Sequence, residues 1–377
     1  MQQPPTPPTF VRYPVTFTGT GPQYRRLWTR NTLLLLLTLG LYYPWAMVSK
    51  FKYFYSHTLI AGHPLGYHAN AAQLFAGNVI ATIVLNAVYY GISKTGDYAV
   101  VGAAALQILT AALTPLLLQG FLQFQLMHTS WRGQRMGLNA SPADAYKSMG
   151  APTLVYTVSG IVAVWAVLAA QAGQIERACW LGLAGTAGLC IGLPFLYYRY
   201  KCHQHRHAVF GPLRNEQPLA FNADSTVWTR TALIAILAVF GLVLPLAVAL
   251  SSQTGFDIRD LGRFSRLSQS HVLSTLMVVG PVLFIGTALM MALPYPYLSV
   301  QLQNRLWSQT GHRQLRFESQ VPVVPHLKLT ARHWGLIVCT LGLYYPQALI
   351  IETRARLQAV SVLIMGDVAD LLPDPPS

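Results

Sequence analysis

Eight long stretches without a charged residue constrain this fold more than any other feature of the sequence. They cover residues 31–49, 74–93, 98–127, 148–175, 178–198, 231–256, 267–304 and 334–351. A helix rises about 1.5 Å per residue, so roughly 20 apolar residues cross the hydrocarbon layer of a bilayer. The second to seventh stretches reach that length. Residues 233–250 lack the apolar–polar alternation of a membrane β-barrel. The sequence therefore predicts an all-α polytopic membrane protein with six to eight transmembrane helices.

The composition agrees with a membrane location. Hydrophobic residues make up 53% of the chain and charged residues only 10%, whereas soluble domains carry about 25% charged residues. Lys and Arg number 26 against 12 Asp and Glu, which gives a net charge of +14. The basic residues lie in short connectors between apolar runs, as in cytoplasmic loops of membrane proteins. We therefore expect the lipid bilayer, and no nucleic acid, as the partner of these charges.

The first and last apolar runs differ from the others because each contains a helix-breaking pair. These pairs are Gly40 with Pro44 and Gly342 with Pro346. Such a run either crosses the membrane or enters it and returns. If both runs return, 21 of the 26 basic residues lie on one side of the membrane, against 15 if all eight runs cross. The stronger bias of positive charge towards the cytoplasm favours six full spans with both termini inside.

A repeated heptapeptide indicates internal pseudo-repeats. TLGLYYP occurs at residues 38–44 and again at 340–346. A looser pattern of proline, an aromatic and basic stretch, and then glycine recurs with gaps of 17 or 18 residues. Its members are Pro44/Gly62, Pro115/Gly133, Pro194/Gly211 and Pro294/Gly311. Each stretch is predicted to continue its span as an amphipathic interfacial helix that ends at the glycine. Short strands or loops are expected to follow on the cytoplasmic face.

The aromatic and basic stretches suit the headgroup layer of the membrane. Tyr, Trp, Lys and Arg side chains each have an apolar part, which contacts the lipid tails, and a polar end, which reaches the headgroups and water. Each Lys or Arg near an anionic surface contributes about 1 kcal/mol of attraction. Interfacial contacts with anionic lipid are therefore predicted for Lys50, Lys52, Arg199 and Lys201.

Residues 17–69 resemble the opening of the bacterial YjgN-like family of inner-membrane proteins. The resemblance rests on Phe17, Gly19, Gly21, Tyr24, Trp28, Asn31, TLGLYYPWA at 38–46, the KYFY run at 52–55, Thr58, Gly62, Tyr67, His68 and Ala69. The second TLGLYYP, with Ala348 and Arg354, resembles the closing segment of the family. The resemblance implies a multi-pass protein of the bacterial inner membrane and no particular biochemical activity. We assign residues 17–366 to this transmembrane domain, between a flexible Pro-rich tail (1–16) and a short acidic, Pro-containing tail (367–377).

Three histidines at alternating positions raise the question of a metal site. On a strand, His203, His205 and His207 would share one face and could bind a cation. On a helix only His203 and His207 would align. Lys201 and Arg206 are poor neighbours for a cation, so an interfacial helix is the favoured interpretation. The four cysteines form no C-x-x-C pair, and we expect no metal or other cofactor.

Polar side chains inside the spans are all amides. A path for a polar solute could be lined by Asn78, Asn86, Gln119 and Gln123. Amides in membrane helices also serve as contacts between helices. The clear spans contain no Asp, Glu, Lys or Arg, which would be usual in a proton or ion relay. Catalytic motifs for nucleotide binding, metalloproteases or serine hydrolases are absent from the sequence, so an enzyme is not predicted.

Two functional hypotheses remain open at this point. The leading one is a transporter or pore for a small solute, because the repeats, broken helices and amides are features of such proteins. The alternative is a non-transporting membrane protein that organises anionic lipid or a protein partner through its basic cytoplasmic face. The identity of any solute or partner and the oligomeric state are not encoded in any pattern that we recognise.

Overall fold

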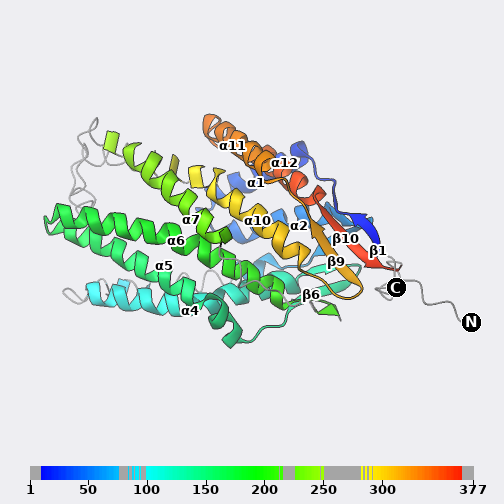
Figure 1. Cartoon of the computed structure of the whole chain (residues 1–377), viewed down its shortest axis with the longest axis horizontal. Helices are drawn as coiled ribbons and strands as arrows, with labels where there is room; N and C mark the ends of the chain where they lie inside the picture. The colour runs from blue at the N-terminus through cyan, green and yellow to red at the C-terminus, as the bar shows by residue number, and fades with distance from the viewer. Residues whose placement is uncertain are drawn as a thin grey trace, which may run out of the picture.

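The protein has a helical layer at one end and a layer of strands at the other, as the computed structural model shows (Figure 1). The structure describes residues 10–75, 99–211, 213–214, 226–246, 248–249 and 292–366. It also describes isolated positions between 84 and 94 and between 282 and 290. The fold is mostly helical, but the expectation of an all-α protein is wrong because the strands form two sheets.

Within the described residues, four helices are long and apolar enough to cross a membrane. They belong to α4 (Ala99–Met127), α5 (Pro142–Gln171), α6 (Ile175–His207) and α7 (Thr226–Ala238), which continues into the π-helical turn η2 (Val239–Val243). The candidate spans within them are Ala105–Met127, Pro142–Ala166, Glu176–His207 and Thr226–Leu246. Most of the predicted runs 74–93 and 267–304 lie outside the described residues, so the six to eight predicted spans stay a prediction.

Helices α5 and α6 pack closely because α6 presents small residues to its neighbour. A Cβ atom added to Gly185 would lie 2.9 Å from the backbone nitrogen of Ala163. One added to Gly192 would lie 3.1 Å from the backbone of Tyr156. Small residues let membrane helices approach until their backbones are in contact. The glycines of α6 therefore set the distance between the two helices.

Gly185→Ala is expected to destabilise the protein by about 1–3 kcal/mol, the usual cost of overpacking. The contacting atoms belong to the backbone of α5, which cannot move aside as a side chain could. Gly182→Ala is the matched control on the same helix. Its added Cβ would meet only the side chain of Ala166, at 3.8 Å, which is an ordinary van der Waals distance. Thermal unfolding in detergent would measure both. Equal melting temperatures for the two variants would contradict this account of the packing.

The larger sheet consists of short antiparallel strands that lie side by side in the order in which they occur in the chain. Its order is β2-β3-β4-β5-β6-β7-β8. The strands are β2 (Thr16–Phe17), β3 (Thr58–Ile60), β4 (His63–Tyr67), β5 (Thr129–Trp131), β6 (Gln134–Leu138), β7 (Ala208–Phe210) and β8 (Leu213–Arg214). Hairpins follow the ends of α2 (Tyr43–Ser56), α4 and α6. Segments far apart in the sequence are thus joined at one end of the helices.

The glycines at the predicted helix ends lie instead in the hairpin turns. Ala61 and Gly62 have φ angles of 49° and 80°, and Arg132 and Gly133 have 47° and 77°. Two successive residues with positive φ are typical of the two-residue turns that join antiparallel strands. The predicted interfacial helices before Gly62, Gly133 and Gly211 therefore end several residues earlier, and the residues before each of these three glycines form a strand. Short strands or loops were predicted after the glycines. Of these segments, GYHA at 66–69 and QLRFES at 314–319 both contain strand residues.

The smaller sheet brings the two ends of the described chain together. Its order is β1 (Phe10–Pro14), β10 (Val360–Met365) and β9 (Leu315–Ser319). Phe10 pairs with Met365 in antiparallel register. Residues 10–14, which we assigned to the flexible tail, form an ordered strand. Both described ends of the chain therefore lie on the same side of the helical layer.

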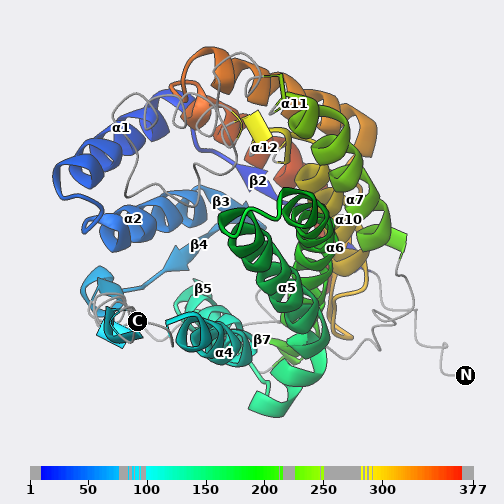
Figure 2. The same cartoon turned by 90° about the vertical axis from the view of Figure 1, so that its left-hand side faces the viewer.

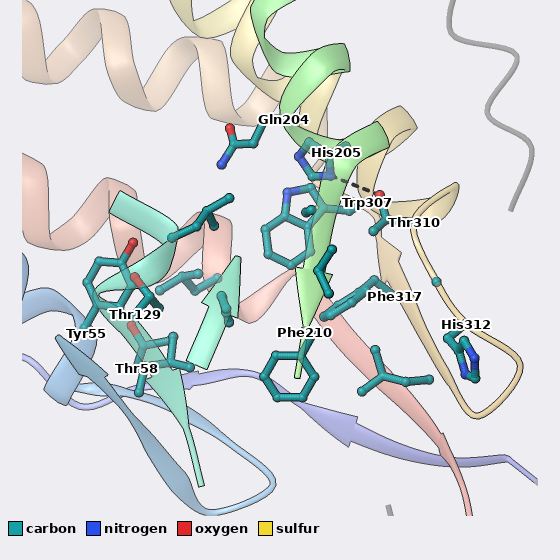
Figure 3. Close-up of a pocket in the computed structure, with 18 of the residues that line it drawn as sticks. Tyr55, Thr58, Thr129, Gln204, His205, Phe210, Trp307, Thr310, His312 and Phe317 are labelled. Carbon is teal, nitrogen blue, oxygen red and sulfur yellow. Dashed lines mark hydrogen bonds between the residues drawn. The ribbon is translucent and has the colours of Figure 1, made fainter. Parts of the chain in front are cut away.

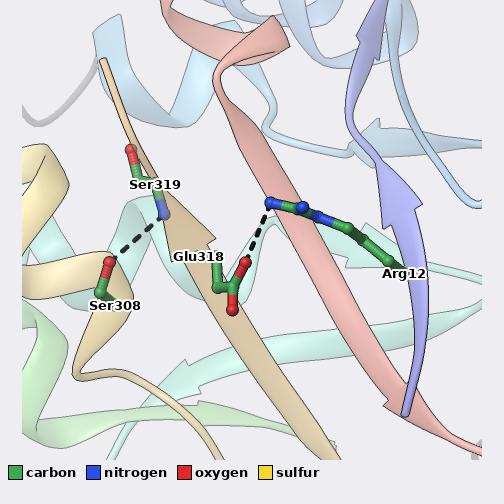
Figure 4. Close-up of polar contacts among 4 residues, drawn as sticks. All are labelled: Arg12, Ser308, Glu318 and Ser319. Carbon is green, nitrogen blue, oxygen red and sulfur yellow. Dashed lines mark hydrogen bonds and ion pairs between the residues drawn. The ribbon is translucent and has the colours of Figure 1, made fainter. Parts of the chain in front are cut away.

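The core of the strand layer joins the two sheets. Trp131 of the larger sheet packs with Val360, Val362 and Ile364 of β10, and all four are almost fully buried. At the surface of the smaller sheet, Arg12 and Glu318 form an ion pair at 2.9 Å (Figure 4). Both side chains of that pair are exposed, so it contributes at most about 1 kcal/mol. Apolar burial is what stabilises this layer.

Two helical hairpins contain the repeated heptapeptide at their tips. The first is α1 (Gly21–Leu37) with α2, and the second is α11 (Val323–Cys339) with α12 (Tyr345–Gln358). The predicted runs 31–49 and 334–351 are therefore each a helix, a tight reversal and a second helix. α1 contacts α12, and Figure 2 shows the two hairpins side by side.

The heptapeptide encodes the reversal through the same bonds in both copies. The threonine hydroxyl donates to the carbonyl four residues earlier at 2.7 Å, in Thr38 and again in Thr340. Gly40 and Gly342 follow with φ angles of 94° and 91°, a conformation that only glycine adopts readily. Pro44 and Pro346 stand in the first turn of the next helix, where a missing N–H costs nothing. These prolines begin a helix and do not kink one.

Candidate functional site: a cavity between the helices and the strands

A cavity of about 410 Å³ lies where the helical layer meets the strands. Its volume falls within the roughly 300–1,000 Å³ of small-molecule sites. The C-terminal ends of α2, α4, α6, α10 (Pro294–Ser308) and α12 all contribute to its wall. The lining residues from these helix ends are Phe54, Tyr55, Leu126, Gln204, His205, Trp307, Thr353 and Leu357. The cavity is thus built by segments from nearly the whole chain.

Apolar side chains dominate the wall, and a few polar groups lie at separate places around it. Trp307 contacts the ring of Phe317 edge-on, with centroids 5.1 Å apart, and lies 5.8 Å from the ring of His205. An Nδ1···Oγ1 hydrogen bond of 2.9 Å joins His205 to Thr310 (Figure 3). Phe210 lies on the opposite side of the cavity from His205 in the same view. The cavity suits an apolar or amphipathic group.

The threonines of the wall add little free hydrogen-bonding capacity. Thr58 donates its hydroxyl to the carbonyl of Phe54, and Thr129 to that of Gln125, each at 2.8 Å. Thr310 repeats the contact with the carbonyl of Leu306 at 2.6 Å. Each threonine satisfies one of the carbonyl groups that a helix leaves unpaired at its end. The same local bond therefore closes three helices around the cavity.

Two basic residues lie beside the cavity on α6 and α12. Lys201 donates to Oε1 of Gln204, a wall residue, at 2.9 Å, and its ammonium lies over the rings of Tyr197 and Tyr200. Arg356 precedes the wall residue Leu357 in α12. The two positive charges are near enough to repel one another.

The three histidines that were considered as candidate metal ligands point to different partners. They belong to α6, so the strand that would align all three is not formed. The rings of His203 and His207 lie 4.7 Å apart, and His203 contacts Ser148 through Nδ1 at 3.1 Å. His205 faces the cavity instead. Within the described residues no group of three His, Cys, Asp or Glu side chains could hold a metal ion.

Two of the four predicted path-lining amides, Gln119 and Gln123, lie within the described residues. Gln119 is buried and donates to the carbonyl of Ala140 at 3.1 Å, which ties α4 to the loop before α5. Gln123, four residues later, is exposed. Asn78 and Asn86 lie outside the described residues.

The predicted lipid-contacting bases have diverse surroundings. Arg199 donates from Nε to the carbonyl of Ser148 at 2.7 Å and so joins α6 to α5. Lys52 is exposed on α2. Burial lowers the pKa of Lys50 on the same helix. Lys201 is the one of the four that borders the cavity through Gln204.

Several wall residues were not singled out in the sequence. The wall residue Trp307, and Arg356 next to the wall residue Leu357, carry no local motif, because their role depends on contacts with helices distant in the sequence. Thr58 and Thr129 could have been recognised, since HTLIAG and HTSWRG share the threonine and the glycine at the same spacing. The pattern marks a helix end followed by a hairpin.

A buried histidine of α11 makes the stability of the protein sensitive to pH. Burial lowers the pKa of His326, and the positive charge of Arg356 lowers it further, with a smaller effect of His333. Glu352 acts in the opposite direction. The neutral imidazole is therefore the form that the fold accommodates.

Lowering the pH from 7.5 to 5 is expected to reduce the melting temperature. The unfolded chain takes up a proton near the ordinary histidine pKa of about 6.5 while His326 in the fold resists it, so stability is lost as the pH falls through that window. Each kcal/mol lost lowers the melting temperature by roughly 2–4 °C. His326→Gln should flatten this dependence, whereas His63→Gln, at an exposed position in β4, should not. The same slope in wild type and His326→Gln would contradict the assignment.

The fold defines a class of protein: a mostly helical membrane protein with a layer of strands at one end of its helices. The chain belongs to a family of bacterial proteins of unknown function, DUF898, whose model matches residues 12–375. It is similar to the "Inner membrane protein YjgN" of Salmonella typhimurium strain LT2, with 26% identity over 349 residues that cover 88% of this chain and 84% of the relative.

Two further relatives carry the same description. The proteins of Escherichia coli O157:H7 and strain K12 are 24% and 23% identical, and each comparison covers 94% of this chain and 89% of the relative. The predicted resemblance to the YjgN-like family is thereby confirmed. No solved structure matches the chain.

Proposed function

We propose that this chain is a multi-pass protein of the bacterial inner membrane that binds an amphipathic molecule at the cytoplasmic end of its helices. The relatives are named as inner membrane proteins. The single observation that carries the binding function is the apolar cavity at the junction of the helices and the strands. An apolar cavity at that depth can receive a molecule directly from the adjacent lipid layer.

The strand pairing supports six full spans with both termini in the cytoplasm. β2 pairs with β3, and β9 pairs with β10, so each helical hairpin leaves and returns to the same layer. β4 to β7 pair in succession, so the segments between them also leave and return. Every excursion from the strand layer then crosses the membrane an even number of times. Three central segments leave the strand layer: the one between β4 and β5, the one between β6 and β7, and the one between β8 and β9. We infer two crossings for each of these segments and none for the hairpins.

The depth of the hairpins supports their re-entry. Arg30 lies nine residues before Leu39, and Arg332 lies nine residues before Leu341. Nine helical residues span about 13 Å, which is half of the roughly 30 Å hydrocarbon layer. Leu39 is 95% exposed and Leu341 is 86% exposed. With the arginines at the headgroups, both tips would reach the middle of the bilayer and be solvated by lipid tails.

Thiol labelling tests this topology. Single cysteines at residues 39 and 341, in a chain whose four native cysteines are replaced by alanine, should resist aqueous reagents from both sides of the membrane. A cysteine at the exposed His63 position of β4 should react only from the cytoplasmic side. Labelling of residue 39 or 341 from the periplasm would mean that the hairpins cross.

Binding of a fluorescent apolar probe tests the function. The purified chain in nanodiscs should bind a probe such as an anilinonaphthalene dye with a fixed stoichiometry, and short-chain lipids should displace it. A chain that is folded by circular dichroism but binds no probe would exclude the proposed function.

Transport of a solute is a second candidate, favoured by one observation. Five helix ends drawn from residues 54–357 converge on the cavity, as expected where repeats meet around a shared site. Flux of polar and amphipathic solutes into liposomes would distinguish the two. Probe binding without flux would favour the binding protein.

A further inference from the structure

Two basic residues, Lys201 and Arg356, lie within one helical turn of wall residues of the cavity, although neither is itself a wall residue. Lys201 shares one face of α6 with the wall residue His205, four positions later. Arg356 follows the wall residue Thr353 by one helical turn. A molecule in the cavity can therefore extend from the apolar wall towards both cations.

Arg356 is fixed in place by a neutral partner. Its Nε donates to Oε1 of Gln303 at 2.7 Å, and Nε2 of Gln303 donates back to the carbonyl of Arg356 at 3.0 Å. Gln303 is itself buried. The amide holds the guanidinium without neutralising it, so the charge remains available to a ligand.

Lys201 is held in a similar way. Its ammonium lies 5.8 Å and 5.6 Å from the ring centroids of Tyr197 and Tyr200 and donates to the neutral Gln204. Aromatic faces and an amide stabilise the position of a cation without supplying a negative charge. Both bases are thus oriented but not neutralised by these contacts.

The nearest acidic residue along α12 is engaged elsewhere. Glu352, one turn before Arg356, contacts Nδ1 of His333 at 3.2 Å. Across the described part of the chain, neither Lys201 nor Arg356 forms an ion pair with a carboxylate. Two partly buried like charges raise the free energy of the fold unless an anion lies between them. Lys201 and Arg356 are therefore arranged so that a bound anion could neutralise both charges.

We propose that Lys201 and Arg356 bind the phosphate of an amphipathic ligand whose apolar part occupies the cavity. This inference rests on the proposed function and names the ligand class: an anionic phosphodiester such as the headgroup of a phospholipid. Arginine contacts phosphate through parallel N–H donors and lysine adds a point charge. A choline headgroup would place a third positive charge at the same position and should bind less well.

Binding of short-chain lipids to the full chain tests the site. Dihexanoyl phosphatidylglycerol is expected to bind at least 10-fold more tightly than dihexanoyl phosphatidylcholine. Lys201→Gln and Arg356→Gln should each weaken binding of the anionic lipid about 10-fold, while Lys201→Arg should stay within 3-fold. Arg135→Gln, which removes an exposed charge from β6, should have less than a 2-fold effect.

The apolar probe separates the possible failures. If the probe binds but the two lipids bind equally, the anion site is wrong and the cavity function stands. If neither probe nor lipid binds, the proposed function fails as well. If inorganic phosphate alone binds as tightly as the anionic lipid, the source of the anion is free phosphate and the assignment to a lipid is overturned. Unchanged binding in both glutamine variants would also overturn the site.

Discussion

Leu39→Asp and Leu341→Asp are each expected to destabilise the membrane-embedded protein by about 2–3 kcal/mol. A carboxylate at the middle of the hydrocarbon layer costs roughly that amount on insertion scales. Both leucines lie at the outermost point of their hairpins and are almost fully exposed. Neither copy of the heptapeptide contains a Lys, Arg or His that could pair with the new charge. Thermal unfolding in nanodiscs would measure the loss.

Val11→Asp is the matched control for these substitutions. Val11 is also an exposed apolar residue, but it lies on β1 in the strand layer, where water surrounds the new charge. Its expected effect is within about 0.5 kcal/mol, as for most surface changes. If Leu39→Asp and Val11→Asp proved equally mild, the hairpin tips would be in water, and the re-entrant topology would fail.

The hairpins also illustrate which parts of this fold could be predicted from sequence. The repeat of TLGLYYP was visible, and so was the choice between crossing and returning. The turn itself depends on local chemistry: a threonine hydroxyl bonded to its own helix, a glycine with positive φ, and a proline in the next first turn. Because all of these contacts lie within eleven residues, 34–44 in the first copy and 336–346 in the second, the sequence alone was sufficient to mark the position of the break.

The strand layer was harder to anticipate. Strands of two to six residues, such as β8 and β10, are too short to show a period of two against apolar surroundings. Their pairing also joins residues that are distant in the chain, as with Phe10 and Met365. The hydropathy pattern therefore assigned the residues before each glycine to helix ends, and short strands were expected only after the glycines, as an alternative to loops.

The cavity was not predicted because the proline–glycine pattern shared by four of its five helix ends does not encode how those ends are arranged in space. His205 was singled out for its histidine neighbours, yet its contact is with Thr310, more than a hundred residues away. Arg356 was counted only as a C-terminal positive charge. A site of this kind depends on how the helices are arranged around the strands, which local patterns do not encode.

Thr353→Trp is expected to weaken binding of the apolar probe at least 10-fold. Thr353 lines the cavity from α12, and an indole in its place would occupy much of a volume of about 410 Å³. The loss follows from exclusion of the ligand, so the melting temperature should change much less than the affinity. Probe titration in nanodiscs would measure the effect, with Thr29→Trp at an exposed position of α1 as the control.

A substitution that enlarges the cavity at another wall residue makes the test specific to the cavity. Trp307→Ala removes the largest side chain of the wall and should allow a bulkier probe to bind, because the volume of the indole is released to the ligand. Its packing against Phe317 is lost at the same time, so a fall in stability of about 3–5 kcal/mol is expected. Binding must therefore be measured below the melting temperature of the variant. If Thr353→Trp binds the probe as wild type does, while Trp307→Ala shows no change in the size of probe accepted, the probe occupies another site and the cavity is not the functional one.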